Sequence, residues 1–268
     1  MLDRENISSV KLFLFDMDGT LYLGEQLFPF TKELLSTIKS QGNNYLFMTN
    51  NSSKSVADYV KKMHRLGIQC DENDFITSAQ ATVYYLNKNN PGAVLYVGGT
   101  NSLKEELSNA GYKITENLDE VQAIVLGFDT ELTFKKLDDI CKILSEKDIP
   151  FYATNPDLSC PTEYGFVPDC GSVSQMIYNA TKKSPVFIGK PSPLMAQLAV
   201  KHLNTDIKDA AVVGDRLNTD IQCGINSGAK SILVLSGETT KEDLINSNVK
   251  PDVVLNDCGE LLNILKTQ

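Results

Sequence analysis

The stretch Val-Lys-Leu-Phe-Leu-Phe-Asp-Met-Asp-Gly-Thr, residues 10–20, decides the fold class of this chain. Its first six residues form a largely apolar run as long as a buried strand, and two aspartates, Asp16 and Asp18, follow at once. Two carboxylates this close repel each other, and a hard cation with oxygen ligands would offset that repulsion. In α/β proteins, ligands bind at the carboxyl ends of parallel strands. The segment therefore predicts a buried strand that ends in a ligand or cation site.

The same segment permits two other interpretations. A calcium-binding loop that begins at Asp16 needs glutamate at its twelfth position, where Leu27 stands, so this interpretation fails. An acidic turn after a strand, with Gly19 allowing a sharp bend, stays open on these residues alone.

Strand-like apolar runs and amphipathic helix-like segments alternate along the chain. Outside the middle, the expected strands are residues 45–48, 210–213, 232–235 and 253–255, and the expected helices are 29–40, 54–66, 192–203, 219–226 and 259–265. The middle has its own series, with strands at 94–97, 123–126 and 150–153 and helices at 101–109, 134–146 and 173–180. Continuous apolar strands separated by helices predict a parallel sheet that is covered on both faces.

Composition and charge restrict the classes of partner. Among 268 residues, 42% are hydrophobic and 22% are charged, which predicts one large or two smaller globular domains. The net charge of −9 argues against nucleic acid and anionic membranes as partners. The N-terminus carries no apolar leader, no run is long enough to span a bilayer, and six cysteines lack C-x-x-C spacing. We therefore expect a cytoplasmic protein with reduced thiols, although a Cys160–Cys170 disulfide stays a minor alternative.

Three more polar motifs follow in order. Thr49 ends an expected strand in FMTNNSS, Lys190 precedes an expected helix in IGKPSP, and VVGDRLNTD supplies Asp215 and Asp220. Taken singly, each has a structural alternative: a strand end, a surface lysine, or a charge that starts a helix. Taken together with the D-x-D-G-T segment, the ordered set resembles the four motifs of the haloacid dehalogenase-like phosphatases.

This resemblance implies a doubly wound, Rossmann-like α/β core and a set of catalytic roles. Asp16 would attack phosphorus and form an aspartyl-phosphate, and Asp18 would act as general acid and then as general base. Thr49 and Lys190 would hold the phosphate, helped by the backbone and side chains of Asn50 and Asn51 at the start of the next helix.

The same resemblance implies Mg²⁺ as the cofactor. The Asp16 carboxylate, the Asp18 backbone carbonyl and Asp215 would hold the ion. Asp220 would support this set as a water-mediated ligand or as an orienting partner.

A long insert separates the second motif from the third. Thr49 and Lys190 lie 141 positions apart, which leaves room for a smaller α/β cap domain of the NagD-type, 4-nitrophenylphosphatase-like branch (subfamily IIA). The expected division is a core at 1–78, a cap at 79–183 and a core again at 184–268. In the TNPD segment of the insert, Asn155 and Asp157 are expected substrate contacts, with a plain Asn-Pro-Asp turn as the alternative.

We therefore expect a Mg²⁺-dependent phosphatase that hydrolyses phosphomonoesters of small metabolites, such as sugar phosphates or nucleotides. A phosphotransferase and a phospho-accepting signalling or binding module stay open as alternatives. The resemblance also gives a homodimer as an expectation, whereas nucleic acid and membrane are not expected partners.

Overall fold

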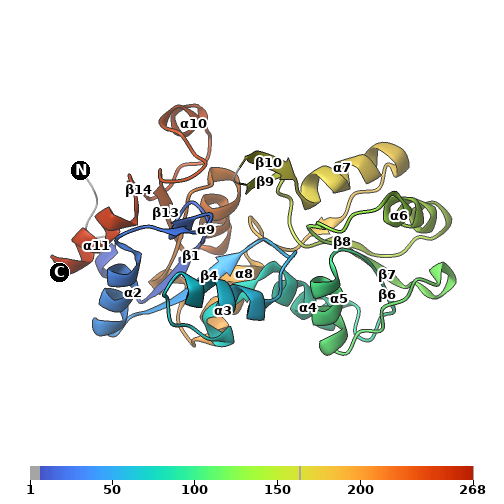
Figure 1. Ribbon diagram of the computed structural model, residues 1–268, viewed down its shortest axis with the longest axis horizontal. Helices are drawn as coiled ribbons and strands as arrows, with labels where there is room; N and C mark the ends of the chain where they lie inside the picture. Colours follow the sequence, from blue (N-terminus) through green and yellow to red (C-terminus); the bar gives the residue numbers. More distant parts are fainter. Residues whose placement is uncertain (1–6, 163, 268) are drawn as a thin grey trace. The chain divides into compact units, whose positions relative to one another are not determined.

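The computed structural model describes residues 7–162 and 164–267, which form two compact units (Figure 1). The first unit holds the described parts of Met1–Thr49, Val60–Ile76 and Lys190–Gln268. The second holds Asn50–Tyr59 and the described parts of Thr77–Gly189. The chain thus first enters the second unit directly after Thr49, returns to the first unit for Val60–Ile76, and leaves the second unit for the last time directly before Lys190. The expected bounds of 1–78, 79–183 and 184–268, and their assignment as core and cap, stay a prediction.

The first unit is built on a six-stranded sheet in the order β14-β13-β12-β1-β4-β5. β1 pairs in parallel with β12 on one side and with β4 on the other, and β12, β13 and β14 continue in parallel. Every residue of β1 and β12 is buried, as expected for central strands covered on both faces. The strands are β1 (Leu12–Phe15), β4 (Asn44–Thr49), β5 (Phe75–Thr77), β12 (Ala210–Gly214), β13 (Lys230–Val234) and β14 (Val253–Leu255).

The order of these strands creates the place for a site. The chain runs from β1 to the neighbouring β4, whereas β12 joins β1 on its other side much later in the sequence. The carboxyl ends of β1 and β12 therefore flank the point where the strand order reverses, which is where open α/β sheets bind ligands.

Helices of the first unit present apolar stripes to the sheet and to each other. In α2 (Thr31–Ser40) the buried residues include Leu34, Leu35 and Ile38, at the spacing of one helix face, and this helix packs against α11. The other helices that involve this unit are α3 (Val56–Arg65), which begins in the second unit, α8 (Leu194–His202), α9 (Gln222–Ser227), α10 (Lys241–Asn246) and α11 (Cys258–Lys266).

The second unit has a four-stranded parallel sheet in the order β11-β8-β7-β6, with helices around it. Its strands are β6 (Leu95–Gly98), β7 (Ala123–Leu126), β8 (Phe151–Ala153) and β11 (Val186–Phe187), and an antiparallel hairpin joins β9 (Ser159–Thr162) to β10 (Gly165–Pro168). Its helices are α4 (Ser78–Asn89), α5 (Asn101–Asn109), α6 (Phe134–Glu146) and α7 (Cys170–Thr181). Residues of β7, β8, α6 and α7 form one buried apolar cluster.

The expected fold class, a doubly wound parallel sheet with a second, smaller α/β domain, is confirmed. One difference bears on the site: the helix expected at 219–226 begins earlier, as a π-helical turn over Leu217–Ile221, and continues as α9. The β9–β10 hairpin was not expected, because its residues alternate little in polarity. Within the described part of the chain, no helix has both the length and the apolar character needed to cross a membrane.

Candidate active site

Asp16 follows the last residue of β1 and lies at the carboxyl edge of the sheet. Its backbone N–H donates to the carbonyl of Val213 in β12 at 2.8 Å, so the strand pairing itself holds its position. The chain then turns at Gly19, which has a φ of +82°. A Cβ atom there would lie 2.6 Å from Oδ2 of Asp215, so only glycine fits at this close approach.

Asp215 follows β12 and is buried beside this turn. The backbone N–H of Glu238 donates to its Oδ2 at 2.7 Å. Gly237 packs so closely that a Cβ atom would lie 2.0 Å from the same oxygen. The loop after β13 and the turn at Gly19 therefore both pack against the Asp215 carboxylate.

Lys190 is a buried lysine that joins three elements of the first unit. Its Nζ donates to Oδ1 of Asp16 at 2.6 Å, to Oδ1 of Asp220 at 2.6 Å and to the carbonyl of Met48 at 3.1 Å. Burial alone would lower the pKa of Lys190, but the two carboxylates raise it above its ordinary value. The side chain is therefore a fixed cation.

Asp220 lies in the π-helical turn and is fully buried. Its Oδ2 accepts from the backbone N–H of Arg216 at 3.1 Å, while its Oδ1 accepts from Lys190. Single π-helical turns are frequent at functional sites, and this one returns the carboxylate toward the strand end.

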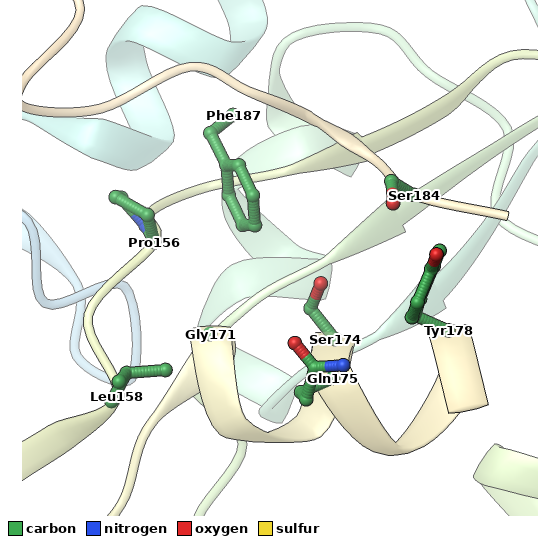
Figure 2. A pocket seen from close by; sticks show the side chains of 8 residues that line it. All are labelled: Pro156, Leu158, Gly171, Ser174, Gln175, Tyr178, Ser184 and Phe187. Carbon is green, nitrogen blue, oxygen red and sulfur yellow. The ribbon is translucent and has the colours of Figure 1, made fainter. Parts of the chain in front are cut away.

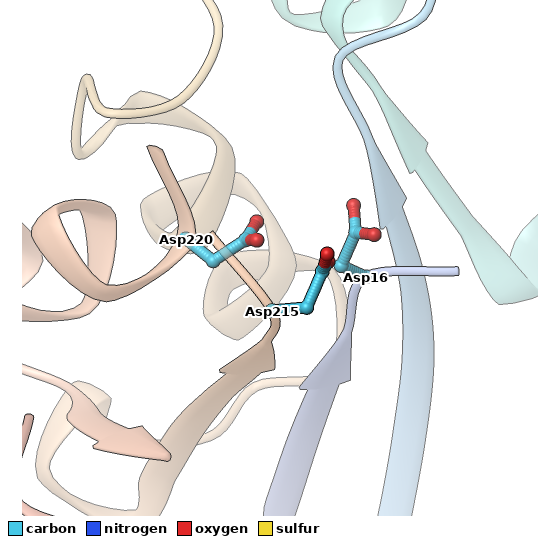
Figure 3. Close-up of side chains that lie close together, drawn as sticks. All are labelled: Asp16, Asp215 and Asp220. Atoms are coloured by element: carbon cyan, nitrogen blue, oxygen red, sulfur yellow. The ribbon is translucent and has the colours of Figure 1, made fainter. Parts of the chain in front are cut away.

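Asp16, Asp215 and Asp220 converge at this edge, and one carboxylate oxygen from each lies within 4.8 Å of the other two (Figure 3). Burial, together with the neighbouring carboxylates, raises the pKa of Asp16 to about 7 and that of Asp215 to about 8. Lys190 and Arg216 oppose this rise at Asp16 without cancelling it. Three carboxylates of this kind are oxygen donors that fit a hard divalent cation, which would relieve their repulsion.

Thr49 is the last residue of β4 and is buried. The parallel register aligns Phe47 with Phe15, so Thr49 lies just beyond the sheet position of Asp16. The structure thus brings Asp16, Lys190, Asp215 and Asp220 together at one sheet edge, where Thr49 also ends its strand.

Known proteins resemble this chain over nearly its whole length. The haloacid dehalogenase-like hydrolase family matches residues 13–113, and a HAD-hydrolase-like family matches residues 187–261. An acid sugar phosphatase of Staphylococcus aureus (strain MRSA252) is 36% identical over 252 residues, which cover 94% of this chain and 96% of that protein. The chain belongs to the haloacid dehalogenase-like hydrolases.

Solved structures place this hydrolase within the family. A 4-nitrophenylphosphatase from Thermotoga maritima is 37% identical with a TM-score of 0.91, covering 96% of this chain and 98% of its own. A glycerol phosphate phosphatase from Mycobacterium tuberculosis, solved in complex with magnesium, is 28% identical with a TM-score of 0.88. The match covers 97% of this chain and 77% of that protein's chain. Our chain is accordingly a phosphoric monoester hydrolase of the NagD-type branch, subfamily IIA.

Four other expected site residues of the hydrolase lie in its second unit, where three of them share a buried network. Asn50 donates from Nδ2 to Oδ2 of Asp157 at 2.7 Å, and the Nδ2 of Asn155 donates to the same oxygen at 2.8 Å and to Asp169 at 3.1 Å. Asn155 is fully buried, and its Oδ1 accepts from the Thr154 hydroxyl at 2.8 Å.

Asn51, the fourth of these residues, uses the carboxamide oxygen of its side chain locally, while its Nδ2 lies 4.0 Å from Sγ of Cys160. Its Oδ1 accepts from the backbone N–H of Ser53 at 2.9 Å and from the Ser53 hydroxyl at 2.7 Å, as in an Asx turn. For all four residues, substrate contact stays a prediction.

The second unit of the hydrolase also has a surface hollow of about 370 Å³ beside α7 (Figure 2). Its lining carries serine, glutamine, tyrosine and apolar groups but no carboxylate and no basic side chain, so it lacks the chemistry of phosphoryl transfer. The lining residues are Pro156, Leu158, Gly171, Ser174, Gln175, Tyr178, Ser184 and Phe187.

The residues that contact the side chains of the site and hold them in place were not predicted from the sequence. Gly237 and Glu238 contact Asp215, and the Arg216 guanidinium pairs with Glu238 at 2.8 Å. Their signal was present in the sequence, because residues 236–239 directly follow an expected strand of the same sheet. Asp169 had no such signal, because its contact with Asn155 forms only in the tertiary structure.

Proposed function

We propose that this hydrolase is a Mg²⁺-dependent phosphatase of small phosphorylated metabolites that works through an aspartyl-phosphate on Asp16. One observation carries the proposal: the buried Lys190 ammonium contacts Asp16 and Asp220 at 2.6 Å each, within a cluster that also holds Asp215. Phosphoryl transfer needs a nucleophilic carboxylate, a fixed cation and acidic side chains that can hold a divalent cation.

In the first step, a carboxylate oxygen of Asp16 attacks phosphorus and the bond from phosphorus to the ester oxygen breaks. The leaving oxygen takes a proton from Asp18. In the second step, water gives a proton to Asp18 and attacks phosphorus, the bond to Asp16 breaks, and inorganic phosphate leaves. Lys190 offsets the negative charge on Asp16 and on the phosphoryl oxygens, with Thr49, Asn50 and Asn51 as the proposed phosphate contacts.

Asp16, the backbone carbonyl of Asp18 and Asp215 would hold Mg²⁺. When bound, the ion supplies positive charge that stabilises the phosphoryl group during transfer. Both carboxylate oxygens of Asp220 accept hydrogen bonds, from Lys190 and from the Arg216 N–H. These contacts support a role for Asp220 in orienting Lys190 and the ligands.

The second unit is the proposed cap, with Asn155 and Asp157 as its expected substrate contacts, which would add selectivity away from the reacting phosphate. The names of relatives, an acid sugar phosphatase and a glycerol phosphate phosphatase, favour sugar and polyol phosphates as substrates.

Cytoplasmic location is proposed from the six cysteines, all free of disulfides. A homodimer stays a prediction.

The test is phosphate release from a panel of phosphomonoesters, including 4-nitrophenyl phosphate, glycerol phosphate, sugar phosphates and nucleotides. We expect wild-type activity with Mg²⁺, loss with a chelator, and loss in Asp16→Asn. Mg²⁺ should also raise the melting temperature of wild type but not of Asp215→Asn, because a ligand stabilises only the fold that binds it.

The same experiment separates the alternatives. A phosphoenzyme that persists for minutes would favour a signalling module, and phosphate passed to an added metabolite would favour a phosphotransferase. Equal activity in wild type and Asp16→Asn would refute the nucleophile.

A further inference from the structure

The chain that follows Asp18 folds back as a small hairpin, which we call the flap, residues 18–27. Its strands β2 (Tyr22–Leu23) and β3 (Gln26–Leu27) pair antiparallel, with Tyr22 opposite Leu27. The turn between them contains Gly24, which has a φ of +58°. The entire flap belongs to the first unit.

The flap contacts the side chain of Asp18. The backbone N–H of Gly24 donates to Oδ1 of Asp18 at 3.4 Å, a long hydrogen bond that depends on where the turn lies. At the base of the flap, the N–H of Gly19 donates to the carbonyl of Tyr22 at 2.8 Å. The turn of the flap therefore supplies a hydrogen-bond donor to the Asp18 carboxyl.

Lys62, on α3, contacts the flap at two residues within the first unit. Its Nζ lies 4.0 Å from the centroid of the Tyr22 ring, and both side chains are buried. The same Nζ lies 4.0 Å from Oε1 of Glu25, in the turn of the flap. One ammonium group thus contacts the flap on both sides of Gly24, through a desolvated cation–π contact and a charge pair.

Arg65, one turn later on α3, provides a natural comparison. Its Nη2 lies 3.5 Å from Oε2 of Glu25, but both side chains are largely exposed. Exposed ion pairs of this kind contribute little to the position of the groups they join, because solvent screens them. Of these two basic residues, Lys62 is the one with the buried contact to Tyr22.

We propose that Lys62 is a positioning residue for the acid–base step, because it holds the flap where the Gly24 N–H meets the Asp18 carboxyl. The inference rests on the proposed function of Asp18. It predicts an effect that depends on the leaving group. When the ester bond of an alkyl phosphate breaks, the leaving alkoxide is strongly basic and needs the proton of Asp18. The 4-nitrophenolate ion is weakly basic and leaves without that proton.

The experiment measures the single-turnover rate of phosphoenzyme formation, with enzyme in excess, for glycerol phosphate and for 4-nitrophenyl phosphate. Acid catalysis contributes roughly 10²–10⁴-fold, so we expect Lys62→Met to lower the glycerol phosphate rate by about tenfold or more. The 4-nitrophenyl phosphate rate should stay within about twofold, since general acid catalysis assists mainly basic leaving groups. Lys62→Arg, which keeps the charge, should restore most of the lost rate, and Arg65→Met should change neither rate.

Asp18→Asn, run beside these variants, separates the two proposals. If Asp18→Asn shows the leaving-group-selective loss and Lys62→Met does not, the positioning role is wrong and the proposed function stands. If Asp18→Asn lowers both rates equally, the acid role itself fails and the positioning role fails with it. Should Lys62→Met not fold, Tyr22→Leu and Glu25→Gln take its place. A loss in Tyr22→Leu that is confined to the glycerol phosphate rate supports the proposal. The proposal is overturned if, in each of the two variants, the two rates fall equally or do not fall.

Discussion

The Nζ of Lys190 lies 2.6 Å from Oδ1 of Asp16, although the two residues are 174 positions apart in the chain. Asp16 follows a central strand, whereas Lys190 is the first residue of the chain's last return to the first unit. Their contact is completed by Asp220, which accepts from the same ammonium at 2.6 Å. The buried Lys190 ammonium therefore offsets negative charge directly at the proposed nucleophile.

Replacement of Lys190 tests this arrangement directly. Lys190→Met removes the cation, and we expect kcat/KM for 4-nitrophenyl phosphate to fall by about 10²–10³-fold or more, as for loss of a charge-stabilising donor. Lys142→Met, at an exposed position of α6, is the control and should keep wild-type activity. A loss smaller than about tenfold in Lys190→Met would contradict the proposed charge-stabilising role.

Gly237 tests the packing around Asp215. In Gly237→Ala the new Cβ would lie 2.0 Å from Oδ2 of Asp215, so the carboxylate must move. We expect activity to fall by about 10²-fold, because a small displacement of a group that helps to position the reacting atoms has effects of this size. Titration of activity with Mg²⁺ should also show that the variant needs a higher Mg²⁺ concentration for half-maximal activity.

The neighbouring residue supplies the matched control for Gly237. Glu238→Ala removes the pair with Arg216 but keeps the backbone N–H that donates to Asp215. It should stay within a few-fold of wild type in activity. Similar losses in the two variants would show that the side chain of Glu238, rather than space at Gly237, governs Asp215.

Glu106, a half-buried residue of α5, gives a stability prediction that depends on pH. Burial raises its pKa to about 7 from 4.5. A raised folded-state pKa means that the group stabilises the fold below its unfolded pKa and loses this contribution as pH rises through about 7. Wild type should lose about 2 kcal/mol more of its unfolding free energy between pH 5 and pH 8 than Glu106→Gln does.

Urea unfolding at the two pH values measures this difference. Glu105→Gln, at the exposed neighbouring position on the same helix, should behave like wild type. If Glu106→Gln and wild type show the same change with pH, the carboxyl of Glu106 is not held out of water in the folded state.

Asp157 tests the buried network of the second unit. Asp157→Ala leaves the Nδ2 groups of Asn50 and Asn155 without this acceptor, and an unsatisfied buried donor costs about 1–3 kcal/mol. We therefore expect a loss of unfolding free energy of about 2 kcal/mol in urea. Asp148→Ala removes a fully exposed carboxylate that lies 3.4 Å from Lys183, and it should be neutral.

Activity measurements on the same variant separate a structural role from a substrate contact. An Asp157→Ala protein of unchanged stability but raised KM would favour direct contact with substrate. A destabilised protein whose KM is unchanged would assign Asp157 to the network alone.

Much of the fold follows from patterns within single segments. The apolar runs that became β1, β4 and β12 are buried strands, and their ends carry Asp16, Thr49 and Asp215 as expected. Parallel strands place their carboxyl ends at one edge, so these three positions were predictable from strand ends alone.

Positions that depend on contacts between distant segments were not predictable in this way. The approach of Gly237 to Asp215 and the contact of Asn155 with Asp169 each join separate segments of the chain. The π-helical turn of Asp220 alters a helix at one turn. The same holds for Asn50, which local pattern assigns to the first part of the core but whose contacts place it in the second unit.

The sequence by itself determined the α/β class, the order of the strands along the chain and the chemical types of the site residues, because periodicity and strand ends are local properties. Only the tertiary structure decided that Lys190 bridges Asp16 and Asp220, and that Lys62 contacts the flap at Tyr22 and Glu25. The physical reason is that a buried charge is held by partners from several elements, and those partners meet only when the whole chain has folded.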